Sequence, residues 1–155
     1  IIIPLSFNND KQAYNQPKTN SSNLSIDINT TDSIELQKIP SIGAKIAGRI
    51  IRYRNALGGF VSKQQLLEVY GIDSNRYQQI FPYFYINQNV IKKININHSD
   101  FNEMTKHPYI DGYLAKKIIQ LREKNGDFSS LEDMQKQTKL YNDLFIQLKP
   151  YLTIQ

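Results

Sequence analysis

The residues best suited to chemistry in this chain form a tight turn before a helix predicted over residues 44–56. Ser41, Ile42 and Gly43 make up the turn, with Ile42 expected to point into the core. The first N–H groups of a helix have no partner within the helix and carry partial positive charge. Because glycine lacks a Cβ, the backbone at Gly43 can come close to an anion. The turn therefore predicts a phosphate-binding site, and the alternative is that Gly43 only permits a tight bend.

Three cations follow the turn at helical spacing. Lys45, Arg49 and Arg52 fall at i, i+4 and i+7, so they share one face of the helix, opposite its apolar stripe. Ala44 and Lys45 form the entry to the helix. Such a face suits a sugar-phosphate backbone, which offers charge and shape without base identity. The alternative is an ordinary solvated face.

The segment that contains this turn occurs twice in the chain. Residues 26–86 (repeat 1) align with residues 94–154 (repeat 2) without a gap, always 68 positions apart, and 19 of the 61 pairs are identical. A duplicated unit is one fold used twice. We therefore expect shared residues to report the fold and differences to report function.

The differences fall on the turn and on the cationic face. Gly43 is replaced by Asp111, and the three cations become Tyr113, Lys117 and Gln120. A carboxylate in the turn would repel a phosphate. The apolar stripe survives as Leu114, Ala115, Ile118 and Ile119. Repeat 2 is thus predicted to have kept its packing and lost the anion site.

Composition sets few limits on the partner. The chain has 155 residues, a net charge of +5 and no cysteine, which excludes disulfides and thiolate metal sites. Basic residues exceed acids by two in repeat 1 and balance them in repeat 2, so the basic character lies in repeat 1 and the linker 87–93. This balance favours acidic partners in general.

The sequence contains no run of 18 apolar residues, so no membrane-spanning helix is predicted. The segment Ile1-Ile2-Ile3-Pro4 is unusual for a free N-terminus, and two interpretations stay open. One is a chain cut just after a membrane anchor or signal segment, which would place the protein at the cell envelope. The other is a short strand or a disordered end. Residues 8–25 are polar, so residues 1–25 are predicted to be a flexible tether.

Start and stop signals predict several short helices in each repeat. Asp32 and Asp100 begin cap-like motifs with a glutamate three residues later, and Ser62 with Gln65 forms a capping-box pattern. Helices are expected over residues 32–39, 44–56, 63–69 and 74–81, and again over 100–106, 112–124, 131–137 and 142–148. The predicted fold is all-α.

The other candidate residues are better explained by structure. His98 and His107 lack the partners and spacing of a metal site and are expected at the surface or at caps. Arg54, which recurs as Arg122, is expected to cover the core edge or cap carbonyls. No nucleophile–base set or phosphate loop occurs, so neither an enzyme nor a cofactor is expected. The aromatic residues of repeat 1 are expected in the core, namely Tyr53, Phe60, Tyr70 and Tyr77.

Repeat 1 also resembles a known family. It is similar to the helix-hairpin-helix domain of the ComEA competence family, whose members are DNA-uptake receptors. Repeat 2 resembles it in degenerate form, and the tandem arrangement is similar to helix-hairpin-helix proteins of the Bacteroidetes. The resemblance rests on Ile28-Asn29-Thr30, Glu35-Leu36, Ile39-Pro40-Ser41-Ile42-Gly43, Ala47, Arg49-Ile50-Ile51, Tyr53-Arg54, Gly59-Phe60, Ser62, Leu66 and Val69-Tyr70-Gly71-Ile72.

The resemblance implies two tandem helix-hairpin-helix domains of the SAM-domain-like type, over residues 26–86 and 94–155. It also implies binding of duplex DNA, without sequence preference, through the amides of the hairpins. Some hairpins of this family hold a monovalent cation on backbone carbonyls. The chain departs from the family at Ser41, where glycine is usual, and at Asp73, which puts an acid in the second hairpin. By position, the DNA-binding residues are Ser41, Ile42, Gly43, Ala44, Lys45, Arg49, Arg52, Gly71, Ile72 and Arg76.

A second class of function remains open from the sequence. The small positive balance of repeat 1, with the acids Asp73 and Asp111 in two turns, would also suit a scaffold that has lost nucleic-acid binding. If repeat 1 binds DNA, repeat 2 is predicted to serve as a packing domain or to bind a protein partner. Convergence of Lys45, Arg49, Arg52 and Arg76 beside both hairpins of repeat 1 would favour DNA binding. Acids that interrupt that face would favour the scaffold.

Overall fold

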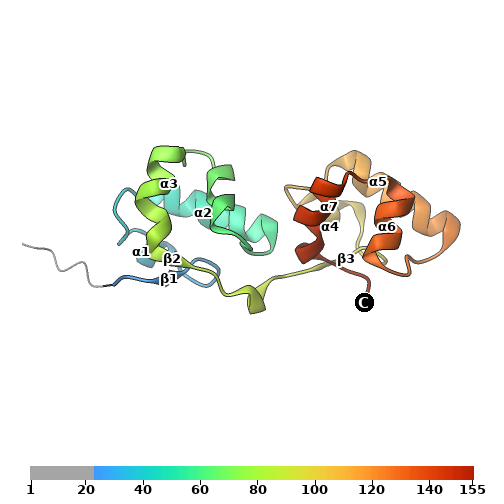
Figure 1. Ribbon diagram of the computed structural model, residues 1–155, viewed down its shortest axis with the longest axis horizontal. Helices are drawn as coiled ribbons and strands as arrows, with labels where there is room; N and C mark the ends of the chain where they lie inside the picture. Colours follow the sequence, from blue (N-terminus) through green and yellow to red (C-terminus); the bar gives the residue numbers. More distant parts are fainter. Residues whose placement is uncertain (1–22) are drawn as a thin grey trace, which may run out of the picture.

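The computed structural model describes residues 23–155, which form two helical units side by side along the long axis (Figure 1). Each unit corresponds to one repeat, and an extended segment joins them along one edge. Most of the predicted tether, including the segment 1–4, lies outside the described residues. None of the described helices is long and apolar enough to cross a membrane.

Short helices dominate both repeats, and the few strands are two residues long. This architecture confirms the predicted all-α fold. Repeat 1 contains β1 (Ile26–Asp27), α1 (Ser33–Leu36), α2 (Ala44–Leu57), the 3-10 helix η1 (Lys63–Glu68), α3 (Ser74–Ile80), the 3-10 turn η2 (Phe81–Tyr83) and β2 (Phe84–Tyr85). After the 3-10 turn η3 (Gln88–Val90), repeat 2 contains β3 (Ile94–Asn95), α4 (Phe101–Thr105), α5 (Gly112–Asn125), α6 (Leu131–Thr138), α7 (Asn142–Leu148), the 3-10 turn η4 (Lys149–Tyr151) and β4 (Leu152–Thr153). The third helix therefore differs between the repeats, because η1 is a 3-10 helix and α6 is an α-helix.

The predicted start signals position the helices. The carboxylate of Asp32 accepts hydrogen bonds from the first turn of α1, including the amide of Glu35 at 2.8 Å. Ser62 and Gln65 form the predicted capping box at the start of η1. Gly58 ends α2 with a φ of 88°, a conformation that favours glycine. These local signals explain why the helix bounds follow the sequence closely.

A short parallel strand pair closes each repeat. β1 pairs with β2, with Ile26 opposite Phe84, and β3 pairs with β4, with Ile94 opposite Leu152. The first and last segments of each repeat are therefore adjacent. Parallel pairing is possible because the helices between the strands provide the long crossover that it needs.

An asparagine next to each strand pair fixes a distant loop. The side chain of Asn29 bonds both backbone groups of Phe60, accepting from its N–H at 2.7 Å and donating to its carbonyl at 2.9 Å. Asn97 makes the same two bonds with Phe128, at 2.9 and 3.1 Å. The identity of these residues in the two repeats thus reflects the fold.

The shared arginine is also structural, as predicted. Arg54 Nη1 donates to the carbonyls of Ile28 and Thr31, at 3.1 and 2.7 Å. Arg122 Nη1 donates to the carbonyl of Ile96 at 2.8 Å. Each guanidinium therefore caps carbonyls of the loop that leads into the first helix of its repeat.

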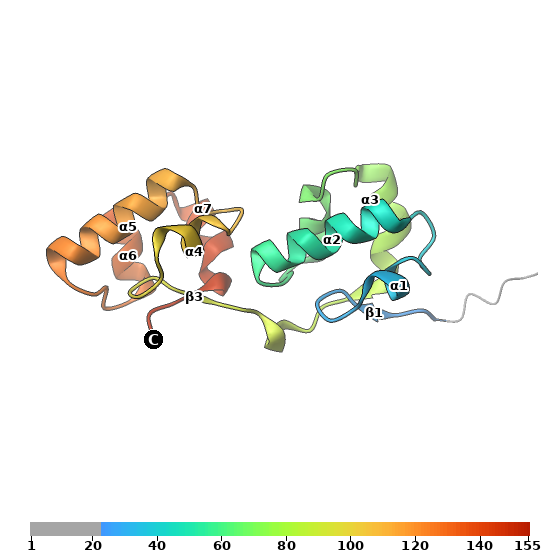
Figure 2. The same cartoon turned by 180° about the vertical axis from the view of Figure 1, so that it is seen from behind.

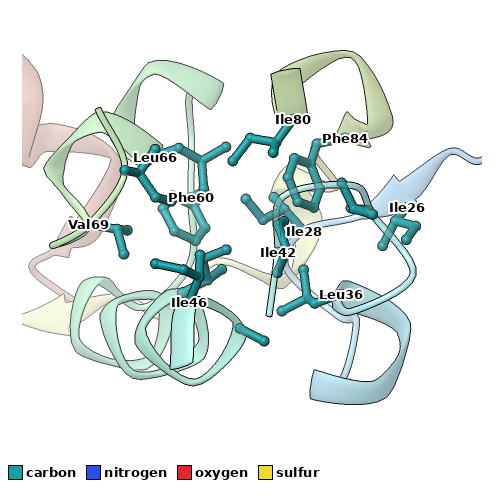
Figure 3. Packing of buried hydrophobic residues seen from close by; sticks show 14 of the residues in the cluster. Ile26, Ile28, Leu36, Ile42, Ile46, Phe60, Leu66, Val69, Ile80 and Phe84 are labelled. Atoms are coloured by element: carbon teal, nitrogen blue, oxygen red, sulfur yellow. The ribbon is translucent and has the colours of Figure 1, made fainter. Parts of the chain in front are cut away.

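The core of repeat 1 anchors the turn before α2. Ile42 and Ile46 point into the same apolar cluster as Phe60 and Leu66 (Figure 3). Ile42 is only 4 % exposed, which confirms that it fixes the turn to the core. Repeat 2 has a separate apolar cluster, in which Ile110 takes the place of Ile42.

The two repeats meet through a buried tyrosine. Tyr151 belongs to repeat 2 but packs in the core of repeat 1, where it is fully buried. Its hydroxyl donates to the carbonyl of Gly59 at 2.7 Å and accepts from Gln65 Nε2 at 2.9 Å. The same Gln65 amide contacts the hydroxyl of Tyr109 at 2.9 Å. Residues far apart in the chain thus form one hydrogen-bonded cluster between the repeats.

A carboxylate extends this cluster to the surface. Glu68, at the end of η1, accepts hydrogen bonds from the hydroxyls of Tyr109, at 2.7 and 2.9 Å, and of Tyr53. Burial raises the pKa of both tyrosine hydroxyls, and Glu68 adds to the effect. Both tyrosines therefore remain neutral donors across the physiological range.

His107 lies beneath this cluster and not at the surface, so the sequence-based expectation is wrong for this residue. It is 2 % exposed, and its ring lies 4.7 Å from that of Tyr151, centroid to centroid. Its Nδ1 accepts from the Tyr109 amide at 3.1 Å, and its Nε2 has no partner within residues 23–155. The position 68 residues earlier is Ile39, a core residue, which explains the burial. His98 is exposed, as expected.

Replacing Tyr151 with phenylalanine should destabilise the protein by about 1–3 kcal/mol, because the buried carbonyl of Gly59 loses its donor. Thermal unfolding followed by circular dichroism would measure the effect. Tyr83 is the matched control, since it occupies the same position in repeat 1 and is only partly buried. Tyr83→Phe should change the stability little, and equal effects of the two substitutions would contradict this account of the interface.

Stability should also depend on His107 at acid pH. Burial lowers the pKa of His107 to about 4, against a weak opposing effect of the Leu57 backbone. The unfolded chain takes up this proton near pH 6.5 and the folded chain only near pH 4. The free energy of unfolding should therefore be intact above pH 6.5 and fall as the pH drops towards 4, by about 3 kcal/mol.

Denaturant titrations between pH 4 and 7 test this dependence. His107→Asn keeps an acceptor for the Tyr109 amide but does not titrate, so its stability should vary less with pH. His98→Asn, on the exposed histidine, should behave as the unmodified protein. An unchanged pH dependence in His107→Asn would assign the effect to other groups.

Candidate nucleic-acid interface

The start of α2 leaves its first amides open. Gly43 is the N-cap residue, with extended backbone, and no side chain bonds the first turn. Within α2, the first backbone amide that donates a hydrogen bond is that of Ala47, to the Gly43 carbonyl at 2.9 Å. No partner for the amides of Ala44, Lys45 and Ile46 is found within residues 23–155. A Cβ at Gly43 would have no atom within 4 Å, so the surface in front of these amides is unobstructed.

The turn before α2 is held from both sides. Ser41 has a φ of 71°, in the left-handed region that glycine adopts most easily. Its hydroxyl bonds the side chain of Gln79 on α3, which ties the turn to the neighbouring helix. Ser41 and Gly43 are exposed while Ile42 between them is buried. The turn therefore presents its backbone to solvent and its side chain to the core.

The corresponding start of α5 is closed by a carboxylate. Asp111 has nearly the same backbone angles as Gly43, with φ −83° and ψ 172° against −92° and 179°. Its Oδ1 accepts from the Leu114 amide at 2.8 Å. The backbone of the two starts is alike, so the side chain alone decides whether an anion can approach. Asp73 caps α3 in the same way, accepting from the Arg76 amide at 2.8 Å.

The cations predicted on α2 differ in exposure and in their contacts. Lys45 and Arg52 are exposed. Arg49 is half-buried, and its Nη1 donates to the Tyr70 carbonyl at 3.2 Å. Its guanidinium also lies 4.6 Å from the centroid of the Tyr70 ring. Tyr70 itself is 81 % exposed, so the expectation that it belongs to the core is wrong.

The second hairpin of repeat 1 is braced by two arginines. Arg76 Nη1 donates to the Gly71 carbonyl, next to the Tyr70 carbonyl that Arg49 contacts. Gly71 has a φ of 92°, and a Cβ there would lie 2.6 Å from Arg49 Nη1. A monovalent cation does not fit these two carbonyls, because each already faces a guanidinium. The exposed Gly71 and the buried Ile72 repeat the pattern of the first hairpin.

Glu68 interrupts the cationic face at one edge. It lines a shallow pocket of about 330 Å³ together with Arg49 and Arg52. Its carboxylate accepts from Tyr53 and Tyr109, which keeps it near the boundary between the repeats. Arg49 and Arg76 thus contact the second hairpin, Lys45 lies in the first turn of α2 after the first hairpin, and Glu68 lies on the side that faces repeat 2. The sequence alone did not indicate that an acid borders the cationic face, because Glu68 belongs to no motif and only lies in a short helix.

The two first hairpins point to different places. In Figures 1 and 2 the turn between α1 and α2 lies at the end of the molecule away from repeat 2, whereas the turn between α4 and α5 faces repeat 1. Tyr109 in the latter turn makes the contacts with Gln65 and Glu68. The open start of α2 is therefore on the free end of the molecule.

Comparison with known proteins agrees with this geometry. The helix-hairpin-helix motif matches twice, over residues 21–85 and 89–153. The chain belongs to the helix-hairpin-helix family. Such motifs generally indicate nucleic-acid binding.

The chain matches only part of each of two longer curated proteins. The chain is 23 % identical over 145 residues to the endonuclease/exonuclease/phosphatase family domain-containing protein 1 of Danio rerio. The alignment covers 80 % of this chain and 26 % of that protein. The chain is 44 % identical over 62 residues to an uncharacterised protein of Haemophilus influenzae. The alignment covers 36 % of this chain and 55 % of that protein. The chain thus spans about a quarter and about half of these relatives. No solved structure gives a significant match.

Exchanging the two N-cap residues should change stability in opposite directions. Gly43→Asp adds the cap that Asp111 provides in repeat 2, and should stabilise the protein by about 0.3–1 kcal/mol. Asp111→Gly should destabilise it by a similar amount. Thermal unfolding of both variants, each compared with the unmodified protein, checks the signs. A loss of stability in Gly43→Asp would mean that the start of α2 cannot take the geometry of α5.

Proposed function

We propose that this chain is a non-enzymatic DNA-binding module, in which repeat 1 contacts the backbone of duplex DNA without sequence preference. The observation that carries the proposal is the pair of N-cap positions. Gly43 leaves the amides of α2 open beside exposed Lys45, whereas Asp111 places a carboxylate against the Leu114 amide of α5 with the same backbone. Open amides at a helix start, next to a cation, bind phosphate oxygens.

The second hairpin supports the same ligand. Arg49 and Arg76 each use a donor on a hairpin carbonyl, yet a guanidinium has five N–H donors and keeps its charge. Positive charge therefore lies beside both hairpins of repeat 1. The role that we assign is the capture of DNA, as in DNA uptake, because repeat 1 resembles the ComEA competence family.

The scaffold alternative has less support from the site. Asp73 and Asp111, the acids that favoured it, are both engaged as helix caps, and neither lies at the start of α2. Glu68 is engaged by two tyrosines at the edge of the face.

Fluorescence anisotropy with a labelled blunt duplex of arbitrary sequence tests the proposal. Binding should weaken steeply as salt increases, since phosphate contacts release counterions. Gly43→Asp should lower the affinity roughly tenfold while the protein becomes more stable, so unfolding cannot explain the weaker binding. Lys45→Glu with Arg52→Glu should also weaken binding, and the slope of the salt dependence should fall by about one for each lysine or arginine that no longer meets a phosphate.

Lys124→Glu provides the matched control for Lys45→Glu alone, because it makes the same charge change on an exposed residue of α5. It should bind the duplex nearly as the unmodified protein does. No measurable association even at low ionic strength would refute the proposal. Equally weakened binding in Lys45→Glu and Lys124→Glu would show that only net charge matters.

A further inference from the structure

Repeat 2 contains a pocket beside its first hairpin. It has a volume of about 590 Å³, within the range of small-molecule sites, and lies between the turn before α5 and the turn before α7. Tyr113 and Lys117 line it from α5, and Lys139, Tyr141 and Leu144 line it from the other side. The sequence comparison assigned no function to these residues.

Substitutions between the repeats explain the opening. In repeat 1 the corresponding space contains Arg49, which reaches across to the carbonyl of Tyr70, and Arg76, which reaches that of Gly71. In repeat 2 the residues at positions 49, 70 and 76 become Lys117, Thr138 and Leu144. Shorter side chains that make no such bridge leave the space between the two turns open.

The rim of the pocket is aromatic and cationic. Tyr113 is 73 % exposed and Tyr141 is 84 % exposed, so two large rings face solvent beside one pocket. Lys117 Nζ lies 5.6 Å from the centroid of the Tyr113 ring. Neither Lys117 nor Lys139 forms an ion pair in the described part of the chain. Asp111, the acid of the lining, is engaged by the Leu114 amide.

Lys139 occupies an unfavourable backbone conformation. Its φ is 59°, and the corresponding residue of repeat 1 is Gly71, the residue type suited to a positive φ. A lysine at this position lowers the stability of the turn relative to glycine, and the residue lines the pocket. Such an outlier is a reason to look for a function of the side chain.

We propose that this pocket binds an unpaired nucleotide of single-stranded DNA, with the base stacked on Tyr113 and Tyr141 and the phosphate at Lys117 and Lys139. Aromatic rings with neighbouring cations are the usual platform for single strands, because every base has a face that can stack. Two lysines without ion pairs favour an anionic ligand over an apolar peptide. The proposal rests on nucleic-acid binding by this chain, yet it uses residues other than those at the start of α2.

Anisotropy with a labelled oligothymidine and with a blunt duplex tests the pocket separately from the α2 site. Tyr141→Ala should weaken oligothymidine binding by roughly 5- to 150-fold, the effect of removing one stacking platform. Lys139→Gly should weaken it by about 2- to 5-fold at low salt while raising the melting temperature. Neither variant should alter binding of the blunt duplex. Ile146→Ala, on an exposed residue of α7 outside the pocket, is the matched control for both probes.

Each outcome decides between the proposals. If the unmodified protein binds the duplex, but Tyr141→Ala and Lys139→Gly bind oligothymidine as well as it does, the pocket proposal is overturned and the α2 site stands. If Gly43→Asp abolishes duplex binding and the Tyr141-dependent oligothymidine binding remains, the pocket is supported as a separate site. If neither probe binds, both proposals fail.

Nuclear magnetic resonance with thymidine monophosphate gives an independent measurement. Titration should shift the backbone amide signals of Tyr113, Lys117, Lys139 and Tyr141, whereas inorganic phosphate alone should leave those of Tyr113 and Tyr141 nearly unchanged. Pocket signals that do not move, with either the nucleotide or the oligothymidine, would overturn the proposal and indicate that the exposed tyrosines meet a protein instead.

Discussion

The two long helices differ in whether a side chain caps their first turn. α2 and α5 have the same length and nearly the same backbone at their N-cap residues. In α5 a carboxylate oxygen lies 2.8 Å from an amide, and in α2 glycine leaves the position to an external acceptor. The rest of each repeat maintains this geometry, since Ile42 or Ile110 anchors the turn in the core. One fold therefore supports both an open and a closed helix start.

The contact between the repeats determines which of the two hairpins faces solvent. Tyr151 inserts into the core of repeat 1, and Gln65 bonds both it and Tyr109. The closed hairpin of repeat 2 is therefore turned inward, where its Tyr109 contributes to the interface. The open hairpin of repeat 1 remains at the free end. Duplication has thus produced one hairpin that faces solvent and another that joins the two halves.

Much of the fold could be predicted from the sequence, because its determinants are local. Caps, the capping box, the glycine that ends α2 and the apolar stripe all act within a few residues, and they gave helix bounds close to those observed. The comparison of the two repeats also separated Arg54, which caps carbonyls, from residues that differ between the copies. It did not show that η1 is a 3-10 helix, because a capping pattern does not distinguish the two helix types.

The parts that could not be predicted depend on residues far apart in the chain. Tyr151 and Tyr83 are the same residue in the two repeats, yet only Tyr151 enters the core of the other repeat. Nothing near His107 indicates that a tyrosine from the C-terminal end covers it. Tyr70 was expected in the core because of its spacing, but the guanidinium of Arg49 holds it at the surface. The candidate DNA-binding residues were identified by position, and their assignment remains a prediction.

The parallel strand pairs have a consequence for how such a chain can lengthen. Because β1 lies beside β2 and β3 beside β4, the backbone enters and leaves each repeat at the same edge. A further copy can be appended there by a connector of a few residues, without opening any interior. Each added module must also present a face that packs against its neighbour, as Tyr151 does here.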